Sequence, residues 1–305
     1  MIKTVKWGII AMLVFMLVFN FMPTGTSTAD LMENFTSMDS KSSNSVISQY
    51  VFVEETTAED PMVGNLRDAI VQLNIDITLK HGNGYLADDG TDTRKLQNGK
   101  GILYSVDYSD VSSKDYGYAP FDVAKSSYDA MVSGTHDYMY FSCHGSCFFT
   151  WKYFWRDSPY ALGGDVPTWI NPGLGFGEDM TGGVITRVTS AEELVKIAEP
   201  GDILWYCTST STYAHSIMYL GDIEIDGHKI TSALRNTGSS NETNDWVIRP
   251  LSYSQKHLFN GNRDVYVLSL VDSINHVLKN GGTAETQDWA SGIEMPEIDP
   301  DAPTA

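Results

Sequence analysis

The sequence predicts an α+β fold in which helices come first and a mostly antiparallel sheet follows. Apolar residues recur at helical spacing in the first half of the chain, and after residue 200 the period changes to alternation. Turn residues separate the alternating segments, as is typical of antiparallel strands joined by short connections. With 305 residues, of which 42% are hydrophobic, the chain is long and apolar enough to bury a full core.

The predicted elements have recognisable periods and boundaries. Residues 61–79 and 120–132 carry apolar side chains at helical spacing. Residues 191–199 form a short helix that a capping box of Ser190 and Glu193 opens. Extended segments with turn residues between them are predicted over residues 101–109, 202–207, 215–225, 228–236, 245–251 and 264–271.

The ends of the chain differ in composition from the segment between them. Residues 1–29 combine two lysines, an apolar stretch and a closing run of small residues, which predicts an export signal. The alternative is an uncleaved anchor that enters the membrane through residues 7–22. Residues 30–60 indicate a flexible spacer, and residues 279–305 a disordered acidic tail. The protein is therefore expected to be secreted or held at the cell surface.

One domain remains over residues 61–278, and its motif-bearing core covers about residues 120–270. The formal net charge of the chain is −19, and no cluster of Lys and Arg interrupts the acidity. A nucleic-acid binder needs such a cluster to displace counterions, so nucleic acid is not an expected partner. The acidity suits solubility outside the cell, and a monomer is expected.

The three cysteines are the main functional signal. An odd number in an exported protein leaves at least one thiol unpaired within the chain. Cys143 and Cys147 both lie near the start of a predicted buried helix, each preceded by a serine that can cap it, and a helix N-terminus stabilises a thiolate. His215 begins a predicted strand and could serve as the base, so the pattern indicates a cysteine nucleophile.

Two further stretches carry a resemblance to a known family. "PGDILWY" at residues 200–206 and "AHSIMYLGD" at residues 214–222 resemble the paired strand motif of NlpC-type cell-wall cysteine peptidases. In that family a Pro-Gly-Asp turn enters one strand and the base histidine opens the next, which assigns the base to His215 here. The resemblance covers roughly residues 120–270.

The nucleophile segment of the family is similar to "FSCHGS" at residues 141–146. Cys143 takes the place of the nucleophile, while Ser142 stands where the family has aspartate and His144 where it has serine. "GSCFFTW" also resembles the related CHAP amidases, which would make Cys147 the nucleophile instead. Cys143 is preferred because the residue one turn further along the helix is then small.

The resemblance implies a papain-like core, with the nucleophile helix packed on the sheet, and the hydrolysis of peptide or amide bonds in peptidoglycan stem peptides. The third residue of the site is assigned to Asn236, because "ITSALRN" resembles the strand that ends in the orienting asparagine of CHAP domains. No cofactor and no metal are implied. The long segment 158–183 is expected to form a wall of the substrate site.

Three other interpretations fit the same residues. The first is a structural zinc site at Cys143, Cys147 and Cys207, although the C-x3-C spacing is not one of the tight zinc spacings. The second is a disulfide between Cys143 and Cys147, for which the geometry on one helix is rarely relaxed. The third is a non-catalytic surface protein that uses the fold to bind cell-wall peptides or a partner.

Overall fold

The computed structural model describes most of the predicted domain, namely residues 65–94, 101–104, 120–160, 184–208, 214–237, 246–296 and 298. The predicted export segment, the spacer over residues 30–60 and residues 161–183 of the expected wall lie outside the described residues. Within the described ranges, no helix has both the length and the apolar character that crossing a bilayer requires.

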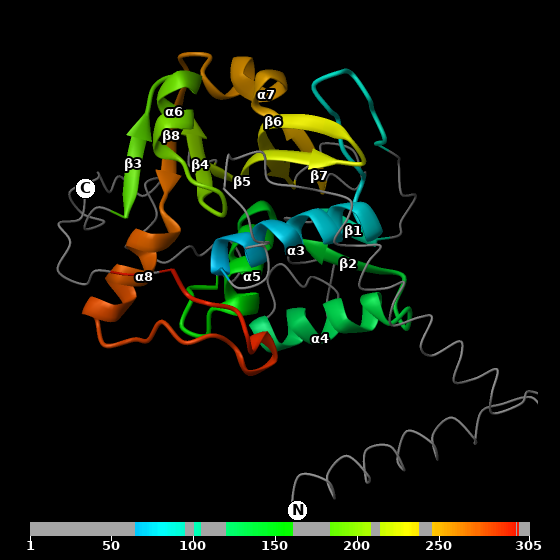
Figure 1. The fold of residues 1–305 in the computed structure, drawn as a ribbon, viewed down its shortest axis with the longest axis vertical. Helices are drawn as coiled ribbons and strands as arrows, with labels where there is room; N and C mark the ends of the chain where they lie inside the picture. The colour runs from blue at the N-terminus through cyan, green and yellow to red at the C-terminus, as the bar shows by residue number, and fades with distance from the viewer. Residues whose placement is uncertain are drawn as a thin grey trace, which may run out of the picture. The chain divides into compact units, whose positions relative to one another are not determined.

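A six-stranded antiparallel sheet forms the second half of the domain (Figure 1). Its strand order is β3-β8-β4-β5-β6-β7, so the last strand in the chain lies between the first two of the sheet. The strands are β3 (Ile185–Val188), β4 (Ile203–Thr208), β5 (Ala214–Ile225), β6 (His228–Asn236), β7 (Val247–Pro250) and β8 (Arg263–Leu268). Together with the helices that precede it, this sheet confirms the predicted α+β fold.

Helices cover both faces of the sheet. The first three are α3 (Leu66–Lys80), α4 (Phe121–Val132) and α5 (Cys143–Phe154). Helix α5 packs against β5, and α3 and α4 pack against α5, whereas α7 contacts β6 and β7 (Figure 1). The remaining elements are α6 (Ala191–Ile197), α7 (Leu251–Leu258), α8 (Leu270–Lys279), the 3-10 turn η4 (Asp288–Ala290) and a separate parallel pair, β1 (Gly101–Tyr104) with β2 (Tyr138–Phe141).

Alternation along the strands assigns side chains to one face or the other. Tyr206 lies directly opposite His215 in the β4–β5 register, and Tyr206 belongs to the apolar cluster that α6 and α7 complete. Trp205 lies opposite Ser216 in the same register, so these two side chains point to the other face, which α5 covers. The start of β5 therefore presents one residue to each layer of helices.

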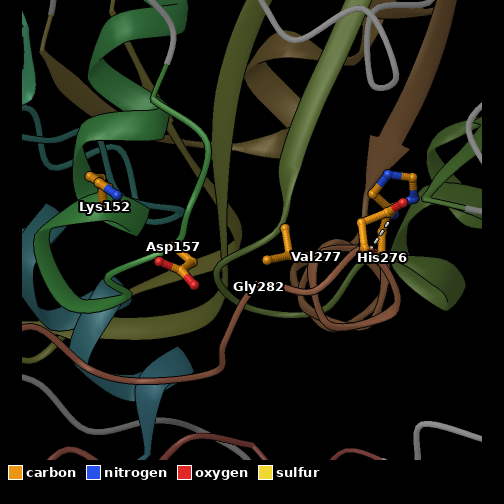
Figure 2. A pocket seen from close by; sticks show the side chains of 6 residues that line it. Lys152, Asp157, His276, Val277 and Gly282 are labelled. Atoms are coloured by element: carbon orange, nitrogen blue, oxygen red, sulfur yellow. Dashed lines mark hydrogen bonds between the residues drawn. The ribbon is translucent and has the colours of Figure 1, made fainter.

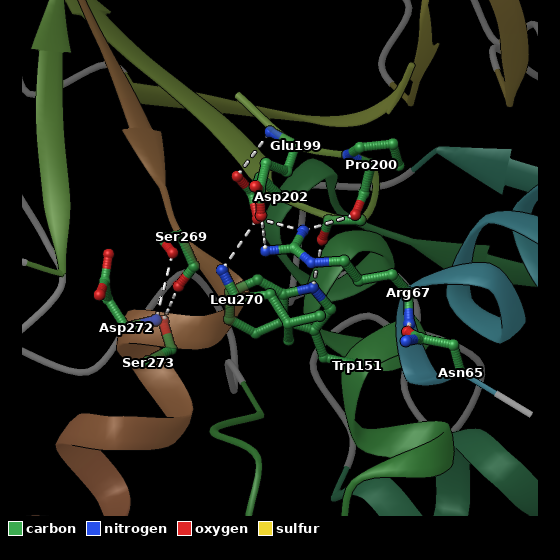
Figure 3. A network of polar contacts seen from close by, with 11 residues as sticks. Asn65, Arg67, Trp151, Glu199, Pro200, Asp202, Ser269, Leu270, Asp272 and Ser273 are labelled. Atoms are coloured by element: carbon green, nitrogen blue, oxygen red, sulfur yellow. Dashed lines mark hydrogen bonds and ion pairs between the residues drawn. The ribbon is translucent and has the colours of Figure 1, made fainter. Parts of the chain in front are cut away.

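The Pro200–Gly201–Asp202 turn that enters β4 ties three helices together (Figure 3). The Asp202 carboxylate accepts hydrogen bonds from Arg67 of α3 and from the backbone N–H of Leu270 in α8, each at 3.0 Å. The indole of Trp151 in α5 donates to the Gly201 carbonyl at 2.7 Å. Burial raises the pKa of Asp202, while Arg67 and the backbone donors act in the opposite direction. The turn thus fixes where α5 lies against the sheet.

The segment after residue 268 differs from the sequence prediction. The alternating pattern predicts a strand to residue 271, but β8 ends at Leu268 and α8 begins at Leu270. The Ser269 hydroxyl accepts from the Asp272 N–H at 3.1 Å, which caps the new helix. A short apolar run followed by a cap has the same composition as a continued strand, so the period alone does not distinguish them.

The C-terminal segment also differs, because residues 280–296 pack onto the domain where the sequence predicts a disordered tail. The Trp289 indole donates to the Tyr153 carbonyl at 2.7 Å, and the Leu66 N–H donates to the Glu294 carbonyl at 2.7 Å. Arg156 forms ion pairs with two acidic side chains of this segment. Each contact joins residues more than 120 positions apart, so local composition carries no sign of it.

Candidate active site

Cys143 is the first residue of α5 and is 4% exposed. The hydroxyl of Ser142 accepts a hydrogen bond from the Gly145 N–H at 3.0 Å and so caps the helix. A serine at this position therefore supports the start of the helix although the resembled family has an aspartate there. The sulfur lies at the positive end of the helix dipole, which favours a thiolate.

His215 and Asn236 lie next to each other at the facing ends of β5 and β6. Asn236 pairs with Ile217 in the register, two residues from His215, and its amide oxygen lies 2.7 Å from His215 Nε2. Because an amide oxygen only accepts, Nε2 carries the proton in this pair. The other ring nitrogen, Nδ1, is buried and can accept a proton. The tautomer that Asn236 selects is the one a general base requires.

The structure brings Cys143 together with His215 and also with the neighbouring His144. Burial acts to raise the pKa of the Cys143 thiol, but the positive charges of His144 and His215 and their hydrogen bonds to the sulfur hold that pKa well below its ordinary value. A lowered pKa increases the fraction of thiolate, which is the nucleophilic form of cysteine.

Cys147 lies one turn further along α5 and has a different neighbour. Its sulfur is 3.5 Å from a guanidinium nitrogen of Arg235, on β6. Burial raises the pKa of Cys147, and Arg235 only partly opposes this effect. Of the two cysteines that the sequence leaves open as nucleophiles, Cys143 is the one beside His215.

The positions of the cysteines support neither the disulfide nor the zinc site. Cys143, Cys147 and Cys207 are all free and buried, so the disulfide interpretation is wrong. Cys207 lies on β4 opposite Asp264, and burial raises the pKa of its thiol. Among the described residues, no group of three or more His, Cys, Asp or Glu side chains is arranged to hold a metal ion.

His144 is a site residue that the sequence patterns do not identify. Its ring stacks on the indole of Trp205, with centroids 4.4 Å apart and planes 10° apart. Its Nδ1 lies 2.6 Å from the Ser216 hydroxyl. The alternation of β4 and β5 places Trp205 and Ser216 on the face toward α5, which is the one signal in the sequence for this contact.

On the opposite face of β5, the surroundings of His215 include Tyr206 and His257. The Tyr206 ring lies 5.2 Å from the His215 ring, and its hydroxyl is 3.4 Å from His257 Nε2. Burial lowers the pKa of His257, and the nearby charges of Arg263 and His215 act in the same direction. The sequence offers no pattern around His257 and predicts it at the surface, and the structure confirms that it is exposed.

A cavity of about 560 Å³ lies beyond the other end of α5. Lys152 and Asp157 face His276 and Val277 of α8 across it (Figure 2). Lys152 is nine residues from Cys143, about 13 Å along the helix axis, so this cavity is separate from the Cys143 site. It contains none of the predicted site residues.

The chain was compared with protein families, curated proteins and solved structures. No family model matches it, and neither a curated protein nor a solved structure does.

Proposed function

We propose that the protein is an exported cysteine hydrolase with a papain-like core that cleaves peptide or amide bonds in peptidoglycan stem peptides. The observation that carries the proposal is that Cys143, at the start of α5, lies beside His215, which in turn is bonded to Asn236. The thiol pKa is lowered, and the bond to Asn236 selects the imidazole tautomer. A nucleophile, a base and a group that orients the base are the three parts that thiol catalysis needs.

The reaction follows from this order. His215 takes the thiol proton at Nδ1, and the Cys143 sulfur attacks the carbonyl carbon of the scissile bond. The same nitrogen then returns the proton to the leaving amine, which leaves an acyl group bound to the sulfur as a thioester. Water attacks the thioester with His215 as the base, and the carboxylic acid product leaves. Asn236 keeps the ring in one orientation through both steps.

The negative charge on the carbonyl oxygen during attack requires donors nearby. The first N–H groups of a helix have no partner within it, and Ser142 already caps the N–H of Gly145. The earlier N–H groups of α5, at Cys143 itself, are therefore the donors that would meet the oxygen. The helix dipole adds to their effect.

Support for the substrate class is of a different kind. It comes from the resemblance of residues 200–206 and 214–222 to cell-wall peptidases and from the predicted export signal. Both are properties of the sequence, and the wall is the polymer that an exported enzyme with this motif order would meet. The cavity beside Lys152 plays no part in this proposal.

Digestion of purified peptidoglycan tests the proposal, with release of new amino groups as the readout. We expect Cys143→Ser to lower the rate by roughly 10⁴-fold or more, since removal of a nucleophile has effects of this size. Cys147→Ser is the matched control on the same helix and should stay within a few fold of the unchanged protein. Release that survives Cys143→Ser contradicts the assignment.

The non-catalytic interpretation makes a different prediction in the same assay. A binding protein would sediment with insoluble peptidoglycan and release no amino groups, and Cys143→Ser would not change its sedimentation. That result would replace the hydrolase proposal.

A further inference from the structure

We propose that His144 donates a hydrogen bond from Nε2 to the Cys143 sulfur, so that two imidazoles flank the thiolate, and that Ser216 and Trp205 position His144 for this role. The catalytic meaning of this inference rests on the proposed function, although the inference itself concerns only the state of the thiol. The resembled family has a serine at this position, so the role belongs to this chain.

The ring of His144 is fixed in two directions. Stacking on Trp205 at 4.4 Å sets its plane, and the 2.6 Å contact of Nδ1 with the Ser216 hydroxyl sets its rotation within that plane. All three side chains are buried, with Ser216 at 0% and His144 at 8% exposure. A histidine held by an aromatic ring and a hydroxyl has lost the rotamer freedom that a surface histidine keeps.

The contact with Ser216 occupies Nδ1 and leaves the other ring nitrogen for the sulfur. Because a thiolate only accepts, a neutral ring beside it carries its proton on Nε2, and the serine hydroxyl then donates to Nδ1. In an imidazolium, Nδ1 donates to the serine oxygen and Nε2 is again protonated. Nε2 therefore remains a donor in both charge states. Because Nδ1 is occupied by Ser216, Nε2 is the nitrogen that faces Cys143, the adjacent residue in the helix.

The two histidines approach the sulfur from different layers. Ser216 is opposite Trp205 in the register and His215 is opposite Tyr206, so consecutive residues of β5 serve the two faces. His144 belongs to the layer of α5, whereas His215 belongs to the layer that contains Tyr206 and His257. Removal of one imidazole thus leaves the other in place.

The geometry separates the roles of the two rings. Asn236 binds Nε2 of His215 and orients the ring, and Nδ1 is the acceptor nitrogen that takes and returns the proton. His144 presents a donor to the sulfur and stabilises the thiolate without taking its proton. The lowered pKa of Cys143, to which both rings contribute through charge and hydrogen bonds, is the result expected of this pair.

Other titratable or charged groups around the site act on the same sulfur only from further away. His257 and Arg263 lie beyond Tyr206 on the face of His215. Arg235 lies on the face of α5, where it is bonded to Ser146 and Cys147. His257 also acts on His215, so the suitable control for a change at His144 is His276, which lines the cavity beyond the other end of α5.

The test is residue-specific alkylation of Cys143 by iodoacetamide across pH 4 to 9, read by peptide mass spectrometry on the full chain. His144→Phe keeps a ring to stack on Trp205 but removes the donor. We expect it to raise the pKa of Cys143 and to lower the thiolate fraction near pH 6 by roughly 10- to 100-fold, the effect of one hydrogen bond to a charged group.

Three further variants make the result specific. His144→Gln returns an N–H donor at the position of Nε2 and should recover part of the reactivity. Ser216→Ala should shift the alkylation profile in the same direction as His144→Phe but by less, and His276→Gln should leave it unchanged. Circular dichroism and thermal melting confirm that each variant folds.

An alkylation profile for folded His144→Phe that matches the unchanged protein would overturn the inference. So would a shift in His144→Phe that His144→Gln does not reduce, since that pattern indicates packing rather than a donor. The assay needs no substrate, so it is independent of peptidoglycan digestion. Digestion that fails while the profile shifts contradicts only the proposed function, and digestion that proceeds without a shift contradicts only the role of His144.

Discussion

Cys143 and Cys147 lie one turn apart on the same helix, and both are buried, yet the pKa values of their thiols are shifted in opposite directions. The pKa of Cys143 is lowered by two imidazoles, whereas burial raises the pKa of Cys147 despite a guanidinium 3.5 Å away. The comparison shows that burial and a nearby cation do not by themselves activate a cysteine. What differs is the kind of neighbour: two imidazoles act on Cys143, whereas Cys147 has one long hydrogen bond from a guanidinium that is shared with other partners.

Arg235 is the cation beside Cys147, the thiol that is not activated. Its guanidinium is fully buried and donates to Asn74 at 2.8 Å, to Ser146 at 2.7 Å and to Thr237, and it lies over the ring of Trp246 at 4.1 Å. These neutral partners already satisfy most of its donors, so little of its hydrogen-bonding capacity is directed at Cys147. Arg235 joins α3 and α5 to β6, the strand of Asn236, and its role in this comparison is structural.

The largest expected effect is on stability, from Arg235→Ala. The variant leaves several buried polar groups without a donor and opens a cavity, so we expect a loss of about 3–5 kcal/mol in the free energy of unfolding. Urea denaturation measures this. Arg187→Ala is the control, because Arg187 is an exposed arginine whose ion pair with Asp264 contributes less than about 1 kcal/mol. A small loss at Arg235 would contradict its structural role.

The next largest loss of stability is expected at the turn before β4, which holds the helix that carries both cysteines. Asp202→Ala removes a buried carboxylate that Arg67 and two backbone N–H groups contact, and we expect a loss of about 3 kcal/mol in stability. Glu199→Ala removes the exposed partner of the same arginine and should cost less than about 1 kcal/mol. Thermal unfolding compares the two. Equal losses would show that the buried contacts of Asp202 carry no special weight.

A smaller effect, on rate only, is expected at Asn236. Asn236→Ala removes the acceptor that holds His215 Nε2, and the loss of one hydrogen bond of about 1.4 kcal/mol lowers peptidoglycan digestion by roughly tenfold. Asn236→Asp keeps an acceptor oxygen and should retain more activity than the alanine variant. Cys147 should remain unreactive in both variants. An unchanged digestion rate in the Asn236→Ala variant would show that Asn236 has no role in the site.

The smallest expected effect comes from the helix caps. Ser142→Ala and Ser190→Ala each remove a side-chain cap, at the start of α5 and of α6, and should each lower stability by about 1 kcal/mol. Only Ser142→Ala should also slow the alkylation of Cys143, because only that cap lies beside the thiol. Chemical denaturation and alkylation rates measure the two effects. Slower alkylation in Ser190→Ala would mean that stability alone controls the thiol.

The sequence predicts well those features that depend on local pattern. Alternation predicts β4, β5 and β6, and the capping serine at residue 190 accepts from the Glu193 N–H as expected, although the Glu193 carboxylate bonds the N–H of Thr189 rather than that of the cap. The motif around His215 predicts a histidine at the start of a strand, which is where it lies.

Features that depend on distant contacts are not predictable in this way. The stacking of His144 on Trp205 joins residues 61 positions apart in the chain, and only the register of β4 and β5 places Ser216 beside the same ring. Arginine is rarely fully buried, so nothing in composition indicates the position of Arg235. The packing of residues 280–296 against α3 and α5 has the same cause, since its partners lie far away in the sequence.

The most direct measurement of the central claim compares the two thiols of α5 in one sample. The unchanged protein is treated briefly with iodoacetamide at a series of pH values, and the labelled fractions of Cys143 and Cys147 are determined from their peptides. We predict that Cys143 is labelled well below pH 8.5, the pKa of a free thiol, while Cys147 is not. Equal labelling of the two cysteines, or labelling of Cys147 first, would contradict the account.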